Sequence, residues 1–565
     1  MQSMKKFIFG TLIASSILFL LVLPLGQDMW YHMYRIGAMA EELQQAPFRL
    51  PIRMLSATYN GYGYGAALYY GDLFLYPFAF LAAAGADVVW VYKLLTVCIW
   101  WTTFGVACFS VKRMGEKQED SMLFAYFYTF SSCCALNLCI RSAIGESLAM
   151  AFLPLVFCSF YGLIKEKKGK DWLWLALGMT AVALSHMLTL LWCVIILAIW
   201  ALWKGKEVFA GGKWLEILKA ALMMLALSAS FLFPMLEQML YQKVQTPTNS
   251  EYQKQAFLDY GIEWMDYFVP YEVKKALTVW FNTDWNIEFW HPGTIGLFAL
   301  LLLLFVIFLK KRRKLQLSPG LKLLFCLSLF TLLALGITPW MKLAREVLAF
   351  MQFSWRILPF ITLGLALTGK GIVQLLSEKK GAAALLLGTF LIFCLAIGPR
   401  YLYQIYVQRG DYQYIQENNP DYYHKYQYAY DPNAADCLYL PAGVWGGLYL
   451  ERGEAVEADQ EGVEFTWKRN PGEITVEITK NPHSRVVLEL PLFMYKGYTA
   501  KTLEGDRLEV AKTRNGLVGV EAGGRTGSFT VSYEGTWLQK LSDIVTIIAI
   551  MGMAYHFYRR RRRKQ

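Results

Sequence analysis

The chain has 565 residues, of which 56% are hydrophobic and only 17% are charged. Soluble globular domains carry about 25% charged residues, so this composition excludes a disordered chain, a fibrous protein and an ordinary cytosolic enzyme. Many apolar runs reach the roughly 20 residues that a transmembrane helix needs. The sequence therefore predicts a polytopic α-helical membrane protein.

The net charge of +12 comes largely from short basic clusters beside apolar runs. These clusters lie at residues 165–170, 310–314 and 559–564. Basic residues that flank membrane spans mark the cytoplasmic ends of those spans. We therefore interpret the positive charge as a topology signal and expect no nucleic-acid partner.

Apolar runs and basic clusters together predict about twelve spans, with both termini in the cytoplasm. Residues 1–398 form the transmembrane module, with outer loops at 26–86 and 237–290. Segment 66–85 is expected at the outer interface, because a crossing there would place the next basic cluster outside. The spans are predicted at 7–25, 87–110, 121–139, 147–164, two within 172–203, 215–235, 292–309, 321–337, 357–376, 382–398 and 537–557.

Residues 399–536 are predicted to lie outside the cell and to contain a β-domain. Hydrophobic and polar residues alternate with period two at 473–479, 485–490 and 527–533, and turn signals such as Asn515-Gly516 separate the runs. Short alternating strands with such turns predict an antiparallel β-sandwich at about 437–535. The final span and the basic tail, residues 537–565, return the chain to the cytoplasm.

Acidic residues gather at the outer ends of the predicted spans, whereas a secondary transporter would place its site near the middle of the membrane. The first of them, Asp28, directly follows the first span. If residues 29–44 form a helix, Asp28, His32 and Arg35 lie on one face at i, i+4, i+7 spacing. This face would combine an acid/base group with an anion-binding group. The alternative is a helix cap followed by a solvated face.

A run of glycines and tyrosines lies in the first outer loop. It contains Tyr62 and Tyr64 within Asn60-Gly-Tyr-Gly-Tyr-Gly65, and Asp72 follows in Tyr-Tyr-Gly-Asp. Glycine allows close backbone approach, and a tyrosine ring can stack on a sugar while its hydroxyl bonds to it. The alternative is an aromatic belt at the membrane interface.

Five further candidates lie at predicted outer ends of spans. Arg141 and Glu146 are five residues apart at the start of a span and suggest a phosphate clamp with a second carboxylate, or else a structural ion pair. His186 lies in the turn of the hairpin at 172–203, and His291 closes an outer loop. Arg356 opens the span at 357–376, where arginine suits a phosphate; snorkelling is the alternative. No metal-binding or nucleophile motif occurs, and a metal held by Asp28 and Glu146 stays open.

The order of these motifs resembles the GT-C class of glycosyltransferases and, within it, the bacterial YfhO-type membrane proteins. An aspartate directly after the first span, in Asp28-Met-Trp-Tyr-His-Met-Tyr-Arg-Ile, is similar to the first outer loop of that class. Further similar motifs are Asn60-Gly-Tyr-Gly-Tyr-Gly, Tyr-Gly-Asp72, Arg141-Ser-Ala-Ile-Gly-Glu146, Leu184-Ser-His186, His291-Pro-Gly, Gln352-Phe-Ser-Trp-Arg356, Leu490-Pro-Leu-Phe-Met-Tyr-Lys-Gly-Tyr498 and Phe529-Thr-Val-Ser-Tyr533.

The resemblance implies an enzyme of the bacterial cell membrane that transfers a sugar from a polyprenyl-phosphate carrier to an envelope glycan or lipid on the outer face. Asp28 would be the catalytic carboxylate and Glu146 the second acidic residue. Arg356 and Arg141 would hold the lipid phosphate. Members of the class often carry paired acidic residues in the first loop, whereas Gln27 and Met29 flank a single aspartate here. A metal requirement is therefore open. Two alternatives remain: a transporter or flippase of lipid-linked glycans, and a non-catalytic envelope assembly protein.

Overall fold

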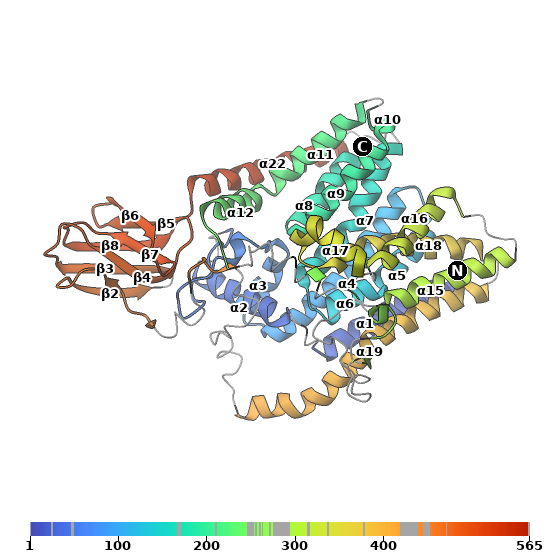
Figure 1. Cartoon of the computed structure of the whole chain (residues 1–565), viewed down its shortest axis with the longest axis horizontal. Helices are drawn as coiled ribbons and strands as arrows, with labels where there is room; N and C mark the ends of the chain where they lie inside the picture. Colours follow the sequence, from blue (N-terminus) through green and yellow to red (C-terminus); the bar gives the residue numbers. More distant parts are fainter. Residues whose placement is uncertain are drawn as a thin grey trace. The chain divides into compact units, whose positions relative to one another are not determined.

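The computed structural model describes most of the chain and divides it into two compact units (Figure 1). One unit comprises Met1–His32, Val89–Met224 and Asn249–Glu417; the other comprises Met33–Val88, Leu225–Thr248 and Asn418–Gln565. The described residues are 2–23, 26, 28–46, 50–165, 171–209, 212–245, 254, 257–258, 262, 264–270, 273–274, 294–312, 317–335, 338–376, 379–418, 439–444, 452–470 and 472–562.

The first unit is helical. Its helices are α1 (Gln2–Leu21), α4 (Val88–Arg113), α5 (Gln118–Thr129), α6 (Ser132–Cys139), α7 (Ile144–Lys165), α8 (Asp171–Ala183), α9 (Met187–Trp203), α10 (Gly205–Phe209), α11 (Lys213–Leu227), α15 (Ile295–Lys311), α16 (Pro319–Leu335), α17 (Thr338–Leu348), α18 (Leu358–Leu375) and α19 (Lys379–Asn418). Short 3-10 turns η4 (Trp264–Tyr267), η5 (Ala349–Met351) and η6 (Ser354–Ile357) lie between them.

As far as the chain is described, each predicted span falls on a helix or, at 121–139 and 215–235, on a bent pair of helices. The apolar helices indicate a membrane protein. Among the described residues, six helices are long and apolar enough to cross a membrane, or up to eight if each of two bent helix pairs counts as one span. The predicted number of twelve is not confirmed. Several of the other helices, such as α8 with 13 residues and α16 with 17, are apolar but short for a full crossing.

Hydrogen bonds between side chains, or from a side chain to the backbone, link some helices of the first unit. The indole of Trp100 on α4 donates to the Ser15 hydroxyl on α1 over 3.0 Å. Tyr128 on α5 donates to the Met150 carbonyl on α7 over 2.7 Å. A hydrogen bond inside an apolar helix bundle satisfies groups that lipid cannot. These contacts link α1 to α4 and α5 to α7, and candidate residues lie at the ends of α1 and α7.

The second unit contains α2 (Met29–Gln45), which begins in the first unit, and then η1 (Ala66–Leu68), η2 (Leu73–Leu75), α3 (Tyr76–Ala83) and α12 (Ala229–Tyr241). The helix predicted at 29–44 is confirmed by α2. The apolar part of segment 66–85 covers only Leu73–Ala83, too short to cross a membrane. Its position at the outer interface stays a prediction.

The strands of the second unit are β1 (Glu457–Ala458), β2 (Glu464–Asn470), β3 (Glu473–Lys480), β4 (Val487–Phe493), β5 (Tyr498–Thr502), β6 (Arg507–Lys512), β7 (Leu517–Glu521) and β8 (Gly527–Tyr533). All pairs are antiparallel, in the order β1-β4-β7-β6-β5-β8-β3-β2. The predicted strands at 473–479, 485–490 and 527–533 correspond to β3, β4 and β8.

The sequence predicted a sandwich of two sheets for this region. The structure instead has one continuous antiparallel sheet, a half-barrel. The reason is β5, which pairs with β8 through Ala500 and Val531 and also with β6 through Ala500 and Leu508. That strand joins what would otherwise be two sheets. The alternation does place one face inside, because Ile474, Val476 and Ile478 of β3 are buried.

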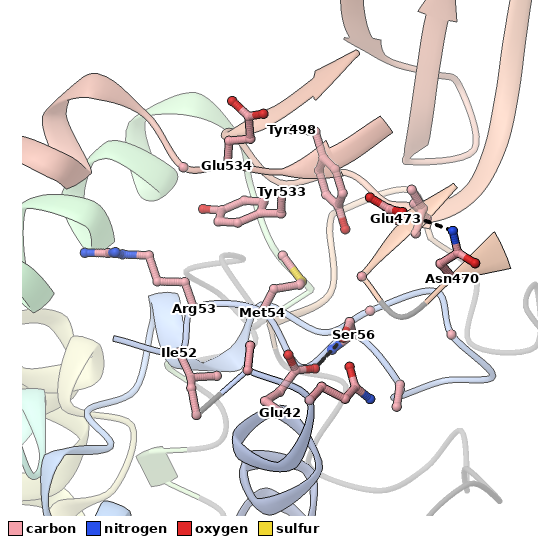
Figure 2. Close-up of a pocket in the computed structure, with 18 of the residues that line it drawn as sticks. Glu42, Ile52, Arg53, Met54, Ser56, Asn470, Glu473, Tyr498, Tyr533 and Glu534 are labelled. Atoms are coloured by element: carbon pink, nitrogen blue, oxygen red, sulfur yellow. Dashed lines mark hydrogen bonds between the residues drawn. The ribbon is translucent and has the colours of Figure 1, made fainter. Parts of the chain in front are cut away.

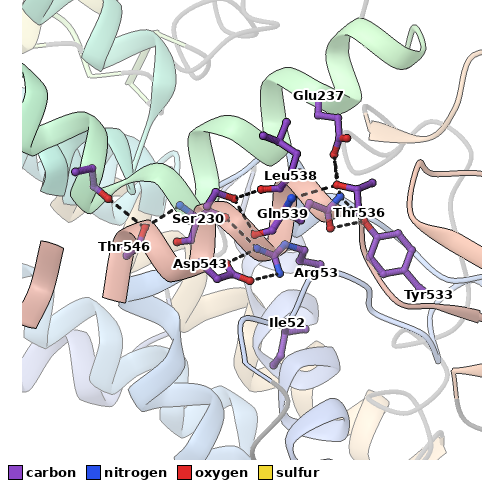
Figure 3. A network of polar contacts seen from close by, with 12 residues as sticks. Ile52, Arg53, Ser230, Glu237, Tyr533, Thr536, Leu538, Gln539, Asp543 and Thr546 are labelled. Carbon is purple, nitrogen blue, oxygen red and sulfur yellow. Dashed lines mark hydrogen bonds and ion pairs between the residues drawn. The ribbon is translucent and has the colours of Figure 1, made fainter. Parts of the chain in front are cut away.

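The last helix, α22 (Trp537–Arg562), packs along α12 through polar contacts at the break between α11 and α12 (Figure 3). The Thr546 hydroxyl accepts from the Ser230 N–H over 2.9 Å and donates to the Ala226 carbonyl over 3.2 Å. Arg53 donates to the Ser230 carbonyl over 3.3 Å and forms an ion pair of 2.6 Å with Asp543. The side chains of Thr546 in α22 and of Arg53 therefore satisfy backbone groups that the helix break leaves open.

Candidate functional site

Five of the predicted residues meet at the ends of helices in the first unit. Asp28 lies between α1 and α2, Arg141 between α6 and α7, and Glu146 in the first turn of α7. His186 is the N-cap of α9, and Arg356 lies in η6 directly before α18. Electrostatic interactions connect Asp28 with Arg141, Glu146 and Arg356, and connect His186 with Glu146, Arg141 and Arg356. We call these five residues the charged cluster.

Two loops hold Asp28 against Arg141. The Asp28 N–H donates to the Arg141 carbonyl over 3.0 Å. A Cβ on Gly26 would meet the side chain of Ser142 and would lie 2.7 Å from the Ile140 carbonyl oxygen. Ser142 itself adopts a left-handed backbone with φ of 56°. The approach of the two loops therefore requires glycine at position 26, since any side chain would separate them.

Arg141 and Glu146 form a buried ion pair. Arg141 Nη1 donates to Glu146 Oε2 over 2.9 Å, and the same nitrogen contacts the side-chain oxygen of Asn137. The ring of Trp355 covers the guanidinium at 5.8 Å. Only 7% of Arg141 and 2% of Glu146 are exposed. A buried pair with these contacts is rigid, and removal of one partner strands the other charge. The structure therefore contains the ion pair that was one of the two alternatives for Arg141 and Glu146.

Asp28 remains partly exposed, unlike the buried pair beside it. Burial by the surrounding loops raises the pKa of the Asp28 carboxyl, and Glu146 adds to this effect. The arginines at 141 and 356 act in the opposite direction but do not cancel the shift. A carboxylate with a raised pKa is a stronger base than one in water. Asp28 is therefore a stronger base than an exposed aspartate.

His186 is neutral and oriented. Its Nδ1 accepts the Thr189 N–H over 3.3 Å, so that nitrogen carries no proton and the ring proton lies on Nε2. Burial, the guanidinium of Arg356 and that of Arg141 lower the pKa of His186 to about 3, although Glu146 opposes them. The imidazole therefore offers an N–H donor and no charge at neutral pH.

Arg356 is half-buried and is held by uncharged acceptors. Its Nη1 donates to the Met351 carbonyl over 3.0 Å and to the Gln352 side-chain oxygen over 2.8 Å. The Phe353 ring lies 4.9 Å from the guanidinium carbon and stacks on Trp355 at 4.4 Å. These two acceptors orient the guanidinium, which also interacts electrostatically with Asp28 and Glu146. An oriented guanidinium is the kind of group that binds a phosphate.

Two residues predicted to bind substrate, Arg35 and Asp72, have structural roles in the second unit. Arg35 pairs with Asp72, donates to the Gly71 carbonyl over 3.2 Å and lies 4.5 Å from the Tyr70 ring. Only 1% of Arg35 is exposed. Because the helix face predicted from Asp28 to Arg35 is occupied in this way, we do not include Arg35 and Asp72 in the site.

The tyrosines at 62 and 64 are fully buried, and both rings are used in packing. The Tyr62 hydroxyl donates to the Gly453 carbonyl over 2.6 Å, and its ring lies 5.1 Å from Phe493. Tyr64 packs edge-on against Tyr59 at 5.3 Å. Neither ring is exposed for stacking on a sugar, so we leave both out of the site.

Two predicted histidines are not part of the charged cluster as described. His32, in α2, is 2% exposed, and its ring lies 5.2 Å from Tyr31. His291 lies outside the described residues. The structure also adds a residue that the sequence did not indicate: Tyr92 of α4 interacts with Ser142 and Asp28. Tyr92 stands inside an apolar run, so only the folded chain reveals its proximity.

The charged cluster does not fit a divalent metal. Asp28 and Glu146 are its two carboxylates, and Arg141 already occupies Oε2 of Glu146. Within the part of the chain that the structure describes, no group of three or more His, Cys, Asp or Glu side chains could hold a metal ion. Divalent cations prefer several oxygen ligands. We derive no step through a metal.

Comparisons with known proteins add one distant likeness. No protein-family model and no curated protein matches the chain. Among solved structures, the chain is similar to the arabinofuranosyltransferase AftD from Mycobacteria, with a TM-score of 0.39 and 13% sequence identity. The likeness covers 70% of this chain and 27% of that one. The chain thus spans about a quarter of the AftD structure, and a likeness at this TM-score carries no argument about fold or activity.

Proposed function

We propose that the chain is a membrane glycosyltransferase of the GT-C type, which transfers a sugar from a polyprenyl-phosphate carrier to an envelope glycan or lipid on the outer face. The observation that carries this proposal is the charged cluster. It combines a carboxylate of raised pKa, Asp28, with an oriented cation, Arg356, at the ends of apolar helices. The order of motifs shared with YfhO-type proteins supports the same class.

Each group of the charged cluster has a role in this chemistry. Asp28 takes the proton of an acceptor hydroxyl, and the acceptor oxygen bonds to the anomeric carbon. The bond from that carbon to the phosphate oxygen breaks, and its electron pair leaves with the polyprenyl phosphate. Arg356 stabilises the charge on this leaving group. Attack from the side opposite the phosphate inverts the anomeric carbon.

The remaining members of the charged cluster position the reacting groups. The Nε2–H of the neutral His186 suits a hydrogen bond to an oxygen of the sugar or phosphate. The buried pair of Arg141 and Glu146 fixes the loop whose carbonyl holds Asp28. We assign the pair to positioning, and this assignment accounts for its burial.

The proposal is tested by following both parts of the donor. Proteoliposomes containing the purified protein receive a polyprenyl-phosphate hexose or pentose labelled in the sugar, together with envelope glycan and lipid acceptors. A glycosyltransferase moves the label covalently to an acceptor and releases unglycosylated polyprenyl phosphate. Movement of the intact labelled lipid between leaflets, without transfer, would instead establish a flippase. If neither transfer nor movement between leaflets occurred with any donor, the result would favour an assembly protein.

A further inference from the structure

The second unit contains a pocket of about 480 Å³, which is lined by the end of α2, the loop at 50–63, the sheet and the start of α22 (Figure 2). Two of its acidic side chains are matched by basic ones. Arg53 forms an ion pair of 2.6 Å with Asp543, and Glu534 forms an ion pair with Lys501. Because these charges are already paired, we assign no ligand to this pocket.

A run of basic residues with no acidic neighbours in the sequence lies at the end of α22. Residues 559–564 are five arginines followed by one lysine, and residues 544–565 contain no aspartate or glutamate. The acidic residue that precedes this stretch, Asp543, is paired with Arg53. The C-terminus of a helix supplies only about half a negative charge. The six cations therefore favour an anionic partner.

Two of these arginines share one face of α22 with two tyrosines. The i, i+3, i+4, i+7 spacing of a helix face is followed by Tyr555, Tyr558, Arg559 and Arg562, and we call these four residues the tyrosine–arginine face. The guanidinium carbon of Arg559 lies 5.8 Å from the centre of the Tyr555 ring, and that of Arg562 lies 5.7 Å from the Tyr558 ring. Among the described residues of the second unit, no acidic side chain pairs with either arginine. The rings orient the two cations and leave their N–H donors for an anion.

The position of this face on α22 indicates where the anion would be. The part of α22 that is long and apolar enough to cross a membrane is Trp537–Arg559. The tyrosines at 555 and 558 are 60% and 56% exposed, and both arginines of the face are exposed as well. Tyrosine rings at the end of a membrane span lie at the level of the lipid headgroups. Arginines on the same face, one turn further along, would then lie at the level of the lipid phosphates.

We infer that the tyrosine–arginine face binds the headgroup of an anionic phospholipid, whose phosphate is held by Arg559 and Arg562. A guanidinium binds a phosphate through two parallel N–H donors and is more weakly hydrated than the ammonium group of lysine. Basic clusters directly beside a membrane span attract anionic lipids. The inference concerns a lipid of the surrounding membrane, so it does not rest on the proposed sugar transfer.

The test measures lipid binding by native mass spectrometry of the full-length protein in a neutral detergent. The protein is titrated with phosphatidylglycerol and, separately, with phosphatidylcholine of the same acyl chains. Phosphatidylglycerol should bind more tightly. The double variant Arg559→Gln with Arg562→Gln should weaken the binding of one phosphatidylglycerol molecule by about tenfold or more, because each arginine near an anionic membrane surface contributes about fivefold in affinity. Its thermal unfolding should match that of the wild type, since both side chains are exposed.

The matched control is Lys310→Gln with Lys311→Gln, which removes the same two positive charges at the end of another apolar helix, α15. It should bind phosphatidylglycerol as the wild type does. Inorganic phosphate and a DNA oligonucleotide are added as competitors at physiological ionic strength, and neither should displace the lipid. Equal binding of the two lipids, equal weakening in both double variants, or displacement of the lipid by either competitor would overturn the inference. Asp28→Asn protein should bind the lipid normally, so a failure of the proposed function leaves this result unchanged.

Discussion

At the scale of single residues, the behaviour of Asp28 is set by its surroundings. The ordinary pKa of an aspartate is about 3.9, and a carboxylate of that kind is a weak base. Burial raises the pKa of Asp28, while the guanidinium groups of Arg141 and Arg356 limit the rise. The residue therefore accepts a proton more readily than an exposed aspartate does.

The pH dependence of sugar transfer follows from these shifts. Below its pKa, Asp28 is protonated and cannot act as a base, so activity should fall on the acid side with a midpoint above the ordinary aspartate value. The pKa of His186 is lowered to about 3, so its imidazole is already neutral in this pH range. The transfer rate should therefore show no further change near the usual histidine pKa of about 6.5. Initial rates between about pH 4 and 8 check this prediction. A change in the transfer rate near pH 6.5 that is lost in His186→Asn would contradict this prediction.

Local sequence signals identified some residues of the site but not their partners. Asp28, Arg141, Glu146, His186 and Arg356 each stand at the end of a predicted span, and the fold brings them together. The same reasoning selected Arg35 and Tyr62, which the folded chain buries. Periodicity reports which residues share a helix face but not what covers that face. Only long-range packing decides between a binding role and a structural role.

At the scale of elements, the loop between α1 and α2 determines where Asp28 lies. Gly26 has no room for a side chain beside Ser142 and Ile140. Gly26→Ala should force the loops apart, at a cost of about 1–3 kcal/mol for overpacking. A displacement of about 1 Å at a reacting group lowers rates by about 10²-fold. Thermal unfolding in detergent and the rate of sugar transfer measure the two effects.

Gly10→Ala is the control for this substitution, because Gly10 lies on α1 with nothing within 4 Å of a Cβ. It should leave both stability and transfer rate close to those of the wild type. If Gly26→Ala behaved in the same way as Gly10→Ala, the positioning role of the first loop would be wrong.

The contact between α22 and the break before α12 predicts a second effect. Thr546→Val keeps the shape of the side chain but leaves the Ser230 N–H and the Ala226 carbonyl without this hydroxyl. An unsatisfied buried polar group costs about 1–3 kcal/mol, so the unfolding temperature in detergent should fall. Thr331→Val removes only a bond to the backbone of its own helix and should have little effect. Equal unfolding temperatures for the two variants would contradict the account.

The elements themselves were predictable to different degrees. Strands β3, β4 and β8 follow from period-two alternation, because each buries one face. The joining of two expected sheets through β5 depends on pairing at Ala500, which no local pattern encodes. Spans were located by hydropathy, but short helices such as α8 and bent pairs such as α5 with α6, at 52°, prevent a count from the sequence alone.

At the scale of the whole molecule, the basic clusters predict which parts of the chain meet the cytoplasm. Lys117, before α5, should lie inside, and Lys468 of β2 should lie outside with the β-domain. Both side chains are exposed. A membrane-impermeant maleimide applied to intact cells should label Lys468→Cys and should label Lys117→Cys only after lysis. Labelling of Lys117→Cys in intact cells, above the wild-type background, would contradict the predicted topology.

The account as a whole depends on Asp28 being the base for sugar transfer. The most direct measurement is the transfer rate of Asp28→Asn at saturating donor, with donor binding measured on the same preparation and with Asp506→Asn, an exposed aspartate of the β-domain, as control. Loss of a general base lowers a rate by about 10²–10⁴-fold, so we predict a fall of this size with donor binding retained. Transfer by Asp28→Asn at the wild-type rate would contradict the assignment.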